Sequence, residues 1–342
     1  DPFQVAKRTC RMWCWKAFKW LPVMLILAII IWSYYAYVIQ LCIFTIESTV
    51  QQCVYLVIHH VLLIMFCWSY GQTVFAEIKP FKLPENELEK LLSAETEDAQ
   101  RAILDNYAKD LPIVTRTMSG AVRYCNRCVL VKPDRAHHCS ICSRCVLKMD
   151  HHCPWVNNCV CFFNYKFFML FLGYALVYCI FIMATCLPYF INVLLCSKYN
   201  NGLAGDFGAA ASSGGYHIVF AFFVAMMFAI SLGSLFGYHC YLVINNRTTL
   251  ESFRAPMFRG GADKNGFSIG RFNNFKEVFG NSPNLWLVPV FTRIYTATFF
   301  FLKTTLFNVA RATIFNYQLF LMHVSRRVIY FCFYNPKSPF TH

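Results

Sequence analysis

The stretch CNRCVLVKPDRAHHCSICSRCVLKMDHHCPWVNNC, residues 125–159, carries one spacing of cysteine and histidine twice. In each copy a Cys, Cys, His, Cys series is separated by 3, 10 and 7 positions, and the copies are offset by fourteen residues. The two interleaved sets are Cys125, Cys128, His138 and Cys145, and Cys139, Cys142, His152 and Cys159. Each set offers three thiolates and one imidazole, a normal ligand set for a closed, tetrahedral structural zinc. The stretch therefore predicts a two-zinc module.

Two alternatives to this pairing stay open at the level of sequence. Spacing alone also permits other combinations, such as four cysteines around one ion. A metal-free cluster of thiols is the second alternative, and the repetition of the same spacing argues against it. Disulfides are disfavoured because we expect this segment to lie in the reducing cytosol.

Eight ligands fill two zinc sites and leave Cys153, His151 and His137 unassigned. Asp150 comes directly before His151, and Cys153 follows two residues later. These three residues have the composition of a nucleophile, a base and a carboxylate that orients the base. The competing interpretation is that Cys153 is a spare ligand or structural thiol and Asp150 an acid that supports a metal-bound histidine.

The composition of the 342 residues is that of a polytopic membrane protein: 57% are hydrophobic, 18% aromatic and only 14% charged. Four apolar runs are long enough to cross about 30 Å of hydrocarbon as helices. We expect these spans at 21–46, 53–76, 166–196 and 216–244. The predicted fold is all-α, with four transmembrane helices and the cysteine-rich module between the second and third. Because the chain starts Asp1-Pro2 without methionine, we expect a processed or engineered fragment.

Lysine and arginine concentrate before the first span, between the second and third, and after the fourth. By the positive-inside rule, both termini and the module then face the cytosol. The net charge of +14 fits anionic lipid headgroups or a polyanionic substrate. Nucleic acid is not expected as a partner, since no basic tract with interleaved aromatics lies on a soluble domain.

The division into segments follows from these features. Acidic residues 84–111 predict surface helix ahead of the zinc and catalytic module at 122–165. Residues 293–342, basic and aromatic, predict an interfacial amphipathic helix rather than a fifth span. The expected segments are a basic N-terminus (1–20), two spans (21–76), a cytosolic domain (77–165), two spans (166–244), a cytosolic C-terminal segment (245–292) and the tail (293–342).

From Asp150 to Cys153 the sequence resembles the DHHC-type protein S-acyltransferases, or palmitoyltransferases. The resemblance covers most of the chain, including its four spans. The motifs that carry it are KPDRAHHC (132–139), DHHCPWVNNC (150–159), NYKFF (164–168), NRTTLESFRAP (246–256) and NNFKEVFG (273–280).

The resemblance implies a ping-pong reaction at the cytosolic face of an endomembrane, Golgi or endoplasmic reticulum, or of the plasma membrane. Cys153 would take a long acyl chain from palmitoyl-CoA and pass it to juxtamembrane cysteines of membrane-associated proteins. His151 would be the base, oriented by Asp150, and the two zincs would be structural. Thr249 would contact Asp150, and Asn274 would bind backbone of the C-terminal segment. The helices would enclose the acyl chain.

Coenzyme A carries several phosphate charges, so a basic patch beside the thiol is expected. We expect phosphate contacts from Lys132 and Arg135, with His137 as a further candidate, and fewer from Arg144, Lys148 and Lys166. Solvated or lipid-facing charges are the alternative. Trp155 is expected at the mouth of the acyl site or in packing. Thr248, Thr249 and Glu251 also fit a plain C-terminal cap of the fourth span.

Two departures from the family pattern lie inside the module, just after the last zinc ligand. Cys161 stands where the family usually has Gly, and Phe163 where it usually has Ser.

A non-catalytic zinc-containing membrane adaptor is the alternative function, against which intact Asp150, His151 and Cys153 argue. A zinc transporter would need ligands in mid-membrane, and the spans hold almost no acidic residues.

Overall fold

The computed structural model of the protein describes residues 17–78, 84–109, 111, 113–199 and 215–292. The chain divides into two compact units, residues 1–82 with 115–294 and residues 83–114 with 295–342. The described part of the second unit holds α4 (Glu85–Leu92) and α5 (Glu97–Lys109), so the acidic stretch forms two helices. The predicted tail at 293–342 and most of the N-terminal segment lie outside the described residues.

Four helices of the first unit are long and apolar enough to cross a membrane, which makes the chain an integral membrane protein. The first span is α2 (Leu21–Tyr34) continued by the π-helix η1 (Tyr35–Ile43). The others are α3 (Thr49–Phe75), α6 (Tyr165–Tyr199) and α8 (Gly215–Ile244). The four predicted spans are confirmed; the first ends three residues early, and the second starts four residues early.

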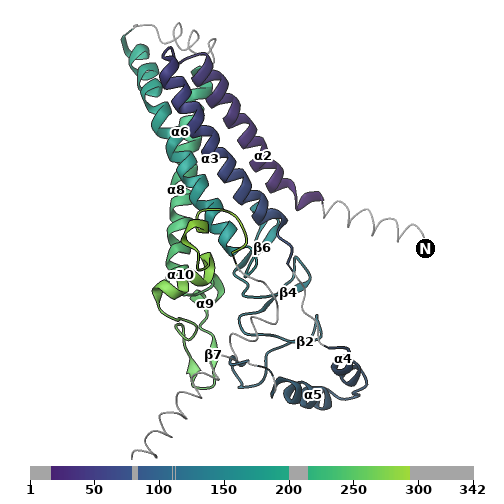
Figure 1. Ribbon diagram of the computed structural model, residues 1–342. Helices are drawn as coiled ribbons and strands as arrows, with labels where there is room; N and C mark the ends of the chain where they lie inside the picture. Colours follow the sequence, from purple (N-terminus) through teal and green to yellow (C-terminus); the bar gives the residue numbers. More distant parts are fainter. Residues whose placement is uncertain (1–16, 79–83, 110, 112, 200–214, 293–342) are drawn as a thin grey trace, which may run out of the picture. The chain divides into compact units, whose positions relative to one another are not determined.

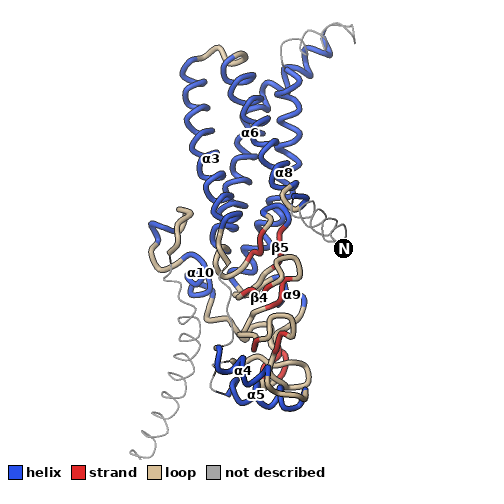
Figure 2. The backbone as a smooth tube through the Cα atoms, turned by 90° about the vertical axis from the view of Figure 1, so that its right-hand side faces the viewer, coloured by secondary structure: helices blue, strands red, loops and turns tan. Residues whose placement is uncertain are grey.

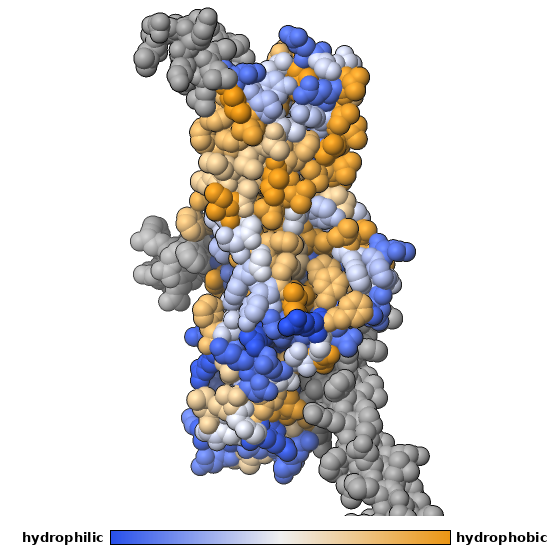
Figure 3. Space-filling model, turned by 90° about the vertical axis from the view of Figure 1, so that its left-hand side faces the viewer, coloured by the Kyte–Doolittle hydropathy of each residue, from blue (hydrophilic) through white to orange (hydrophobic). Residues whose placement is uncertain are grey.

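The long helices lie side by side in a bundle (Figure 1), with α6 packed most extensively against α8 and α3. Buried aromatic and aliphatic side chains from all four spans form one apolar cluster, including Tyr37, Phe66, Phe171 and Phe222. Large apolar residues also cover the outside of the bundle (Figure 3), such as Ile64 and Ile230. A helix that is apolar all round suits a lipid environment, where no polar face is needed.

The module after α3 is built from three short antiparallel hairpins (Figure 2). These add local β-structure to the mostly helical fold that the sequence predicted. The hairpins are β1 (Tyr124–Cys125) with β2 (Leu130–Val131), β3 (His137–Cys139) with β4 (Arg144–Val146), and β5 (His151–Cys153) with β6 (Asn158–Val160).

Side-chain amides join the third hairpin to the end of α3. The Asn158 amide donates to the carbonyls of Thr73, Val74 and Ala76 at 3.0–3.2 Å. The buried Asn164 amide donates to the carbonyls of Thr73 and Cys159 at 3.3 and 2.9 Å. These bonds satisfy carbonyls that the end of a helix leaves without intrahelical partners. They also fix the third hairpin at the end of the bundle.

The segment after α8 holds α9 (Thr249–Phe253), β7 (Met257–Phe258), β8 (Gly261–Ala262), α10 (Arg271–Phe279) and the 3-10 turn η3 (Pro283–Leu285). Buried Asn274 of α10 donates from its amide to the Ile244 carbonyl at 2.7 Å and accepts from the Ile269 N–H at 2.9 Å. Asn274 thus joins α10 to the end of α8, the kind of contact that the resemblance implied.

Candidate active site

The three hairpins of the module repeat one local structure every fourteen residues. The same register pairs Cys125 with Leu130, Cys139 with Arg144, and Cys153 with Asn158. The turn of each hairpin contains a residue with positive φ at the same offset: Val129, Ser143 and Asn157, with φ of 51°, 53° and 46°. We call these units knuckle hairpins. Cys153 therefore holds in the third knuckle hairpin the position that Cys125 and Cys139 hold in the first two.

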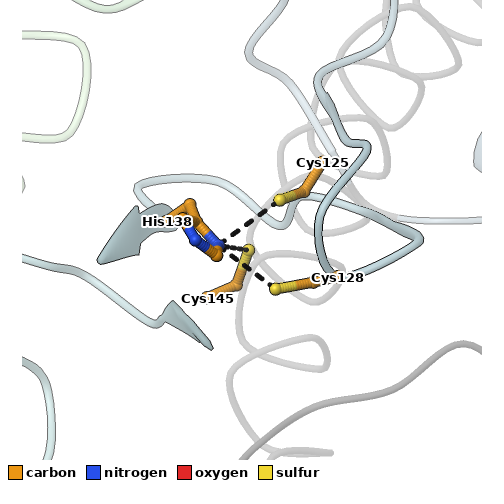
Figure 4. Close-up of side chains that lie close together, drawn as sticks. All are labelled: Cys125, Cys128, His138 and Cys145. Carbon is orange, nitrogen blue, oxygen red and sulfur yellow. Dashed lines mark hydrogen bonds between the residues drawn. The ribbon is translucent and has the colours of Figure 1, made fainter. Parts of the chain in front are cut away.

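Each predicted ligand set comes together across two successive knuckle hairpins. In the first set (Figure 4), Nδ1 of His138 lies 3.6, 3.2 and 4.0 Å from the sulfurs of Cys125, Cys128 and Cys145. In the second, Nδ1 of His152 lies 3.7, 3.4 and 3.6 Å from those of Cys139, Cys142 and Cys159.

These distances fit a tetrahedral zinc in each set. Bonds of about 2.3 Å to sulfur and about 2.0 Å to nitrogen place neighbouring S and N ligands roughly 3.5 Å apart. The Cys142 and Cys159 sulfurs, 3.6 Å apart, are also close to the expected separation. Both Cys/His clusters are thus compatible with zinc, and the role of the ions would be structural because every position is filled by protein.

The interleaving has a simple geometric cause. Each set takes two cysteines from the turn of one knuckle hairpin and an opposed His–Cys pair from the next; His138 faces Cys145, and His152 faces Cys159. The third turn holds Cys153 and Val156 where earlier turns hold two cysteines. It is followed by α6 rather than by a fourth hairpin. Cys153 consequently belongs to neither set.

Cys153 is 7% exposed and packs in the apolar cluster of the helix bundle. Tyr70, Phe168 and Phe171 of α3 and α6 belong to the same cluster. The thiol thus lies where the module meets the membrane helices. His151, two residues earlier on β5, interacts with Cys153 and with Asp150.

Asp150 is 1% exposed and accepts three hydrogen bonds. Nδ1 of His151 donates to Oδ2 at 2.6 Å. The Thr249 hydroxyl donates to the same oxygen at 2.7 Å, and the Thr249 N–H donates to Oδ1 at 2.8 Å. The residue that the resemblance expected beside Asp150 is therefore in direct contact with it, through both its backbone and its side chain.

The electrostatics favour an ion pair between Asp150 and His151. Burial would raise the pKa of Asp150, but the hydrogen bonds from His151 and Thr249 outweigh it and lower that pKa. Burial would lower the pKa of His151, yet the bond to Asp150 and the interaction with Cys153 raise it to about 9. An imidazolium at neutral pH favours a neighbouring thiolate, which is the nucleophilic form of cysteine.

Thr248 and Glu251 form a capping box at the start of α9 rather than a C-terminal cap of the fourth span. The Thr248 hydroxyl accepts from the Glu251 N–H at 3.2 Å, and the Glu251 carboxylate accepts from the Thr248 N–H at 2.9 Å. This arrangement satisfies two N–H groups that a helix start leaves open. It also holds the Thr249 N–H toward Asp150.

Arg135 is buried against Glu251, which corrects the expectation that it contacts a phosphate. Its guanidinium donates to both Glu251 oxygens, at 2.8 and 2.7 Å, and to the side chain and carbonyl of Asn246 at 2.9 Å each. The side chains of the pair are 3% and 6% exposed. A bidentate pair this deeply buried offers no donor to a solvent-borne phosphate.

The other basic candidates are also accounted for. Burial, with the charge of Arg123, lowers the pKa of His137 to about 4, so this ring is neutral at pH 7. The Lys148 ammonium pairs with Glu277 at 2.9 Å. Lys166 is 5% exposed and donates to the carbonyls of Leu285 and Val290 at 2.8 and 3.1 Å. A phosphate contact stays a prediction for half-buried Lys132 and for exposed Arg144.

Trp155 follows the thiol in the turn and is 51% exposed. Its carbonyl accepts a hydrogen bond from the Tyr70 hydroxyl at 2.8 Å, which ties the turn to α3. Cys161 and Phe163, the two departures from the family pattern, pack in a cluster with Ile78, Val146 and Met149. Complete burial raises the pKa of the Cys161 thiol to about 12, so it stays protonated and unreactive.

Sequence reasoning missed His239, which lies on α8 and is 1% exposed. One of its ring nitrogens lies within 4.8 Å of an Asp150 oxygen and of a His151 nitrogen. The available signal was a titratable residue close to the end of an otherwise apolar span, where such residues are uncommon.

Fold and site together define a class: an integral membrane protein with a two-zinc-compatible module and an uncommitted thiol beside a carboxylate–imidazole pair. Comparison of the sequence with known proteins identifies the family. The family described as DHHC palmitoyltransferase matches residues 119–255. Palmitoyltransferase ZDHHC2 of Danio rerio is 53% identical over 285 residues, which cover 82% of this chain and 76% of that protein.

Two further relatives are similar over comparable lengths. Palmitoyltransferase ZDHHC2 of Homo sapiens is 51% identical over 86% of this chain and 77% of its own length. Palmitoyltransferase ZDHHC15 of Xenopus laevis is 47% identical over 82% of this chain and 81% of its own. The chain belongs to the DHHC palmitoyltransferase family, and the resemblance seen in the sequence is confirmed.

Proposed function

We propose that this protein is a protein S-palmitoyltransferase that carries a long acyl chain on Cys153. The observation that carries the proposal is the position of this thiol, which is outside both ligand sets, in contact with His151, and packed in the apolar cluster of the helices. An acyl chain lying among the helices would present its polar thioester to this sulfur.

In the first half-reaction Cys153 gives its proton to His151, with Asp150 stabilising the positive charge that the imidazole takes up. The thiolate attacks the carbonyl carbon of palmitoyl-CoA, and a new S–C bond forms. The bond from that carbon to the coenzyme A sulfur breaks, and the departing thiolate takes the proton from His151. The products are acyl-Cys153 and free coenzyme A.

In the second half-reaction a cysteine of a membrane-associated protein attacks acyl-Cys153. Neutral His151 takes the proton from the incoming thiol, the acyl carbon bonds to the substrate sulfur, and Cys153 leaves as a thiolate. The proton on His151 then returns to Cys153, and the starting state is restored. Transfer between thiols exchanges one thioester for another, so the reaction needs positioning more than driving force.

The zinc ions take no part in these steps. Each would hold two successive knuckle hairpins together through Cys and His ligands, and the second set would hold the hairpin of β5 and β6 to the one before it. We infer that this module, both termini and the active site face the cytosol of an endomembrane or the plasma membrane. The concentration of lysine and arginine before the first span and between the second and third supports that orientation.

The alternative is a non-catalytic zinc-containing adaptor. A scaffold needs the eight zinc ligands but has no use for a carboxylate held by three hydrogen bonds beside an imidazole and a free thiol. The named activity of the relatives also favours the enzyme.

Incubation of purified protein with labelled palmitoyl-CoA tests the proposal. We expect a hydroxylamine-sensitive adduct on the wild type and none on Cys153→Ser, with two zinc ions per chain in both. Cys161→Ala is the matched control, because this buried thiol in the same module lies outside the site and its loss should leave the adduct unchanged. An unlabelled wild type that carries its zinc would favour the adaptor.

A further inference from the structure

His239 of α8 packs against the ring of His151, the proposed base. Its ring centroid lies 5.9 Å from that of His151 and 5.0 Å from that of Phe168. The His151 and Phe168 centroids are themselves 5.6 Å apart. The three rings therefore pack mutually, with one partner on β5, one on α6 and one on α8.

His239 is itself held in place by a hydrogen bond. Its Nδ1 lies 2.9 Å from the Tyr165 hydroxyl, at the first residue of α6. Tyr165 is also in ring contact with both Phe168 and His239. A buried histidine fixed through one nitrogen has a defined ring plane, which makes it a rigid surface for a neighbouring side chain.

A metal site is the competing interpretation, because Asp150, His151 and His239 together supply a carboxylate and two imidazoles. The hydrogen bonds speak against it. Oδ2 of Asp150 already accepts from His151 and Thr249, Oδ1 accepts from the Thr249 N–H, and Nδ1 of His239 bonds to Tyr165. An ion would have to displace several of these bonds.

We propose that His239 is a positioning residue for acyl transfer, whose ring, together with Phe168, forms the wall that holds the His151 imidazole between Asp150 and Cys153. The bond from Nδ1 to Asp150 fixes one edge of the His151 ring but leaves rotation about that contact. Packing against His239 and Phe168 removes this freedom and leaves Nε2 for the contact with Cys153. This inference rests on the proposed function.

The expected effect is on the rate of chemistry rather than on binding. Misplacement of a catalytic group by about 1 Å costs on the order of 100-fold in rate. His239→Ala opens the wall and should slow acylation of Cys153 by about 10- to 100-fold at saturating palmitoyl-CoA. The concentration of palmitoyl-CoA that gives half the maximal rate should change little.

Two further variants separate the ring from its polar edge. His239→Phe keeps an aromatic ring and should recover most of the rate lost in His239→Ala, whereas His239→Gln keeps a partner for Tyr165 without a ring and should not. Tyr165→Phe alone should slow acylation of Cys153, because it removes the hydrogen bond to Nδ1 of His239. In a protein that already carries His239→Phe this bond is absent, so Tyr165→Phe should not slow acylation further.

The experiment is single-turnover acylation of full-length protein in nanodiscs with labelled palmitoyl-CoA, together with zinc content and thermal stability. Cys240→Ala, the next residue on α8, is the control, since its side chain packs toward α10 and Phe279. A wild type that takes no label contradicts the proposed function itself. A wild type that is labelled while His239→Ala reacts equally fast overturns only the positioning role.

The aromatic variant keeps the inference testable if His239→Ala does not fold. A His239→Phe protein could keep two zinc ions and wild-type stability and still acylate Cys153 no faster than His239→Gln. That result would overturn the proposal that the ring of His239 positions His151. Recovery of rate by phenylalanine and not by glutamine would support it.

Discussion

Asp150 accepts three hydrogen bonds, and two of the three come from a residue ninety-nine positions away. Thr249 reaches the carboxylate through its N–H and its hydroxyl, so the start of α9 holds the acid that orients His151. A charge-assisted hydrogen bond of this kind contributes about 1.5–3 kcal/mol.

Thr249→Val should remove only the hydroxyl bond to Oδ2 and leave the N–H bond to Oδ1. We expect single-turnover acylation of Cys153 to slow by about tenfold or more, since 1.4 kcal/mol corresponds to a factor of ten. Thr249→Ser keeps the hydroxyl and is the matched control. Equal rates in the valine and serine variants would show that the hydroxyl does not matter.

The Arg135–Glu251 pair offers a test of stability at the same scale. Glu251→Gln leaves the Arg135 charge buried without its counter-ion, which typically costs about 3–5 kcal/mol. We expect a lower thermal midpoint and earlier zinc release. Arg101→Gln is the control, since the Arg101–Glu97 pair is exposed and such pairs contribute little.

The contribution of the Arg135–Glu251 pair to the stability of the protein should fall as the pH is lowered. Burial would raise the pKa of Glu251, but Arg135 outweighs it and lowers that pKa from its ordinary value of 4.5. The pair's contribution to stability is thus present above pH 4.5 and is lost as the pH falls through the lower folded-state pKa. The difference in thermal midpoint between wild type and Glu251→Gln should shrink on acidification. A difference that stayed constant would contradict the ion pair.

At the scale of elements, the repeated knuckle hairpin explains why one thiol is spared. Ligand sets are shared between consecutive hairpins, so a series of three hairpins closes two zinc sites and leaves the last turn without a partner. Cys153 occupies that turn, and Val156 stands where the pattern has its second cysteine. Cys153, the proposed acyl carrier, thus holds the position of the first cysteine of a knuckle hairpin, without the other ligands of a zinc set.

Val156→Cys should restore a Cys-x2-Cys pair in the third turn. Two thiolates at this spacing bind soft divalent ions, so added cadmium or zinc should inhibit acylation, and a mild chelator should reverse the inhibition. Val156→Ala is the control for the loss of side-chain volume. Insensitivity of the cysteine variant to either ion would mean that the third turn differs in geometry from the other two.

At the scale of the whole first unit, the site depends on elements far apart in the chain. Cys153 and His151 lie on β5, the hydrogen bonds that hold Asp150 come partly from α9, and the rings that pack against His151 come from α6 and α8. Zinc bound at the two Cys/His sets would hold the hairpins in the register that brings these elements together. The helices, by contrast, are stabilised by their own packing and by lipid.

Removal of zinc should therefore abolish the activity of the module while leaving the helix bundle folded. Stripping both ions with a strong chelator should abolish acylation of Cys153, while far-ultraviolet circular dichroism still reports the membrane helices. Chelator saturated with zinc beforehand controls for effects on the detergent or lipid. Full acylation after complete loss of zinc would refute a structural role for the ions.

The sequence predicted much of the fold and part of the site. Apolar runs located four spans, because a length of apolar sequence alone decides whether a helix can cross a membrane. The spacing of cysteine and histidine predicted both four-residue sets, because the members of each set are close in sequence. A zinc ion also requires its four ligand atoms to lie within a few ångströms of one another. The positions of charged residues were harder to predict. Arg135 and Lys166 look like surface cations in the sequence, but both are buried and hydrogen-bonded within the protein.

Local composition was enough to identify a membrane protein, and spacing predicted the two ligand sets and a spared Cys153. Other pairings stayed open at that level, and the structure brings together the two predicted sets. The resemblance implied the contact between Thr249 and Asp150, whereas the packing of His239 against His151 and the burial of Arg135 came from the tertiary structure. Thr249, His239 and the partners of Arg135 are separated from His151 by about a hundred residues, so no local pattern relates them. They meet because α6 and α8 pack together and deliver their ends to the same side of the zinc module.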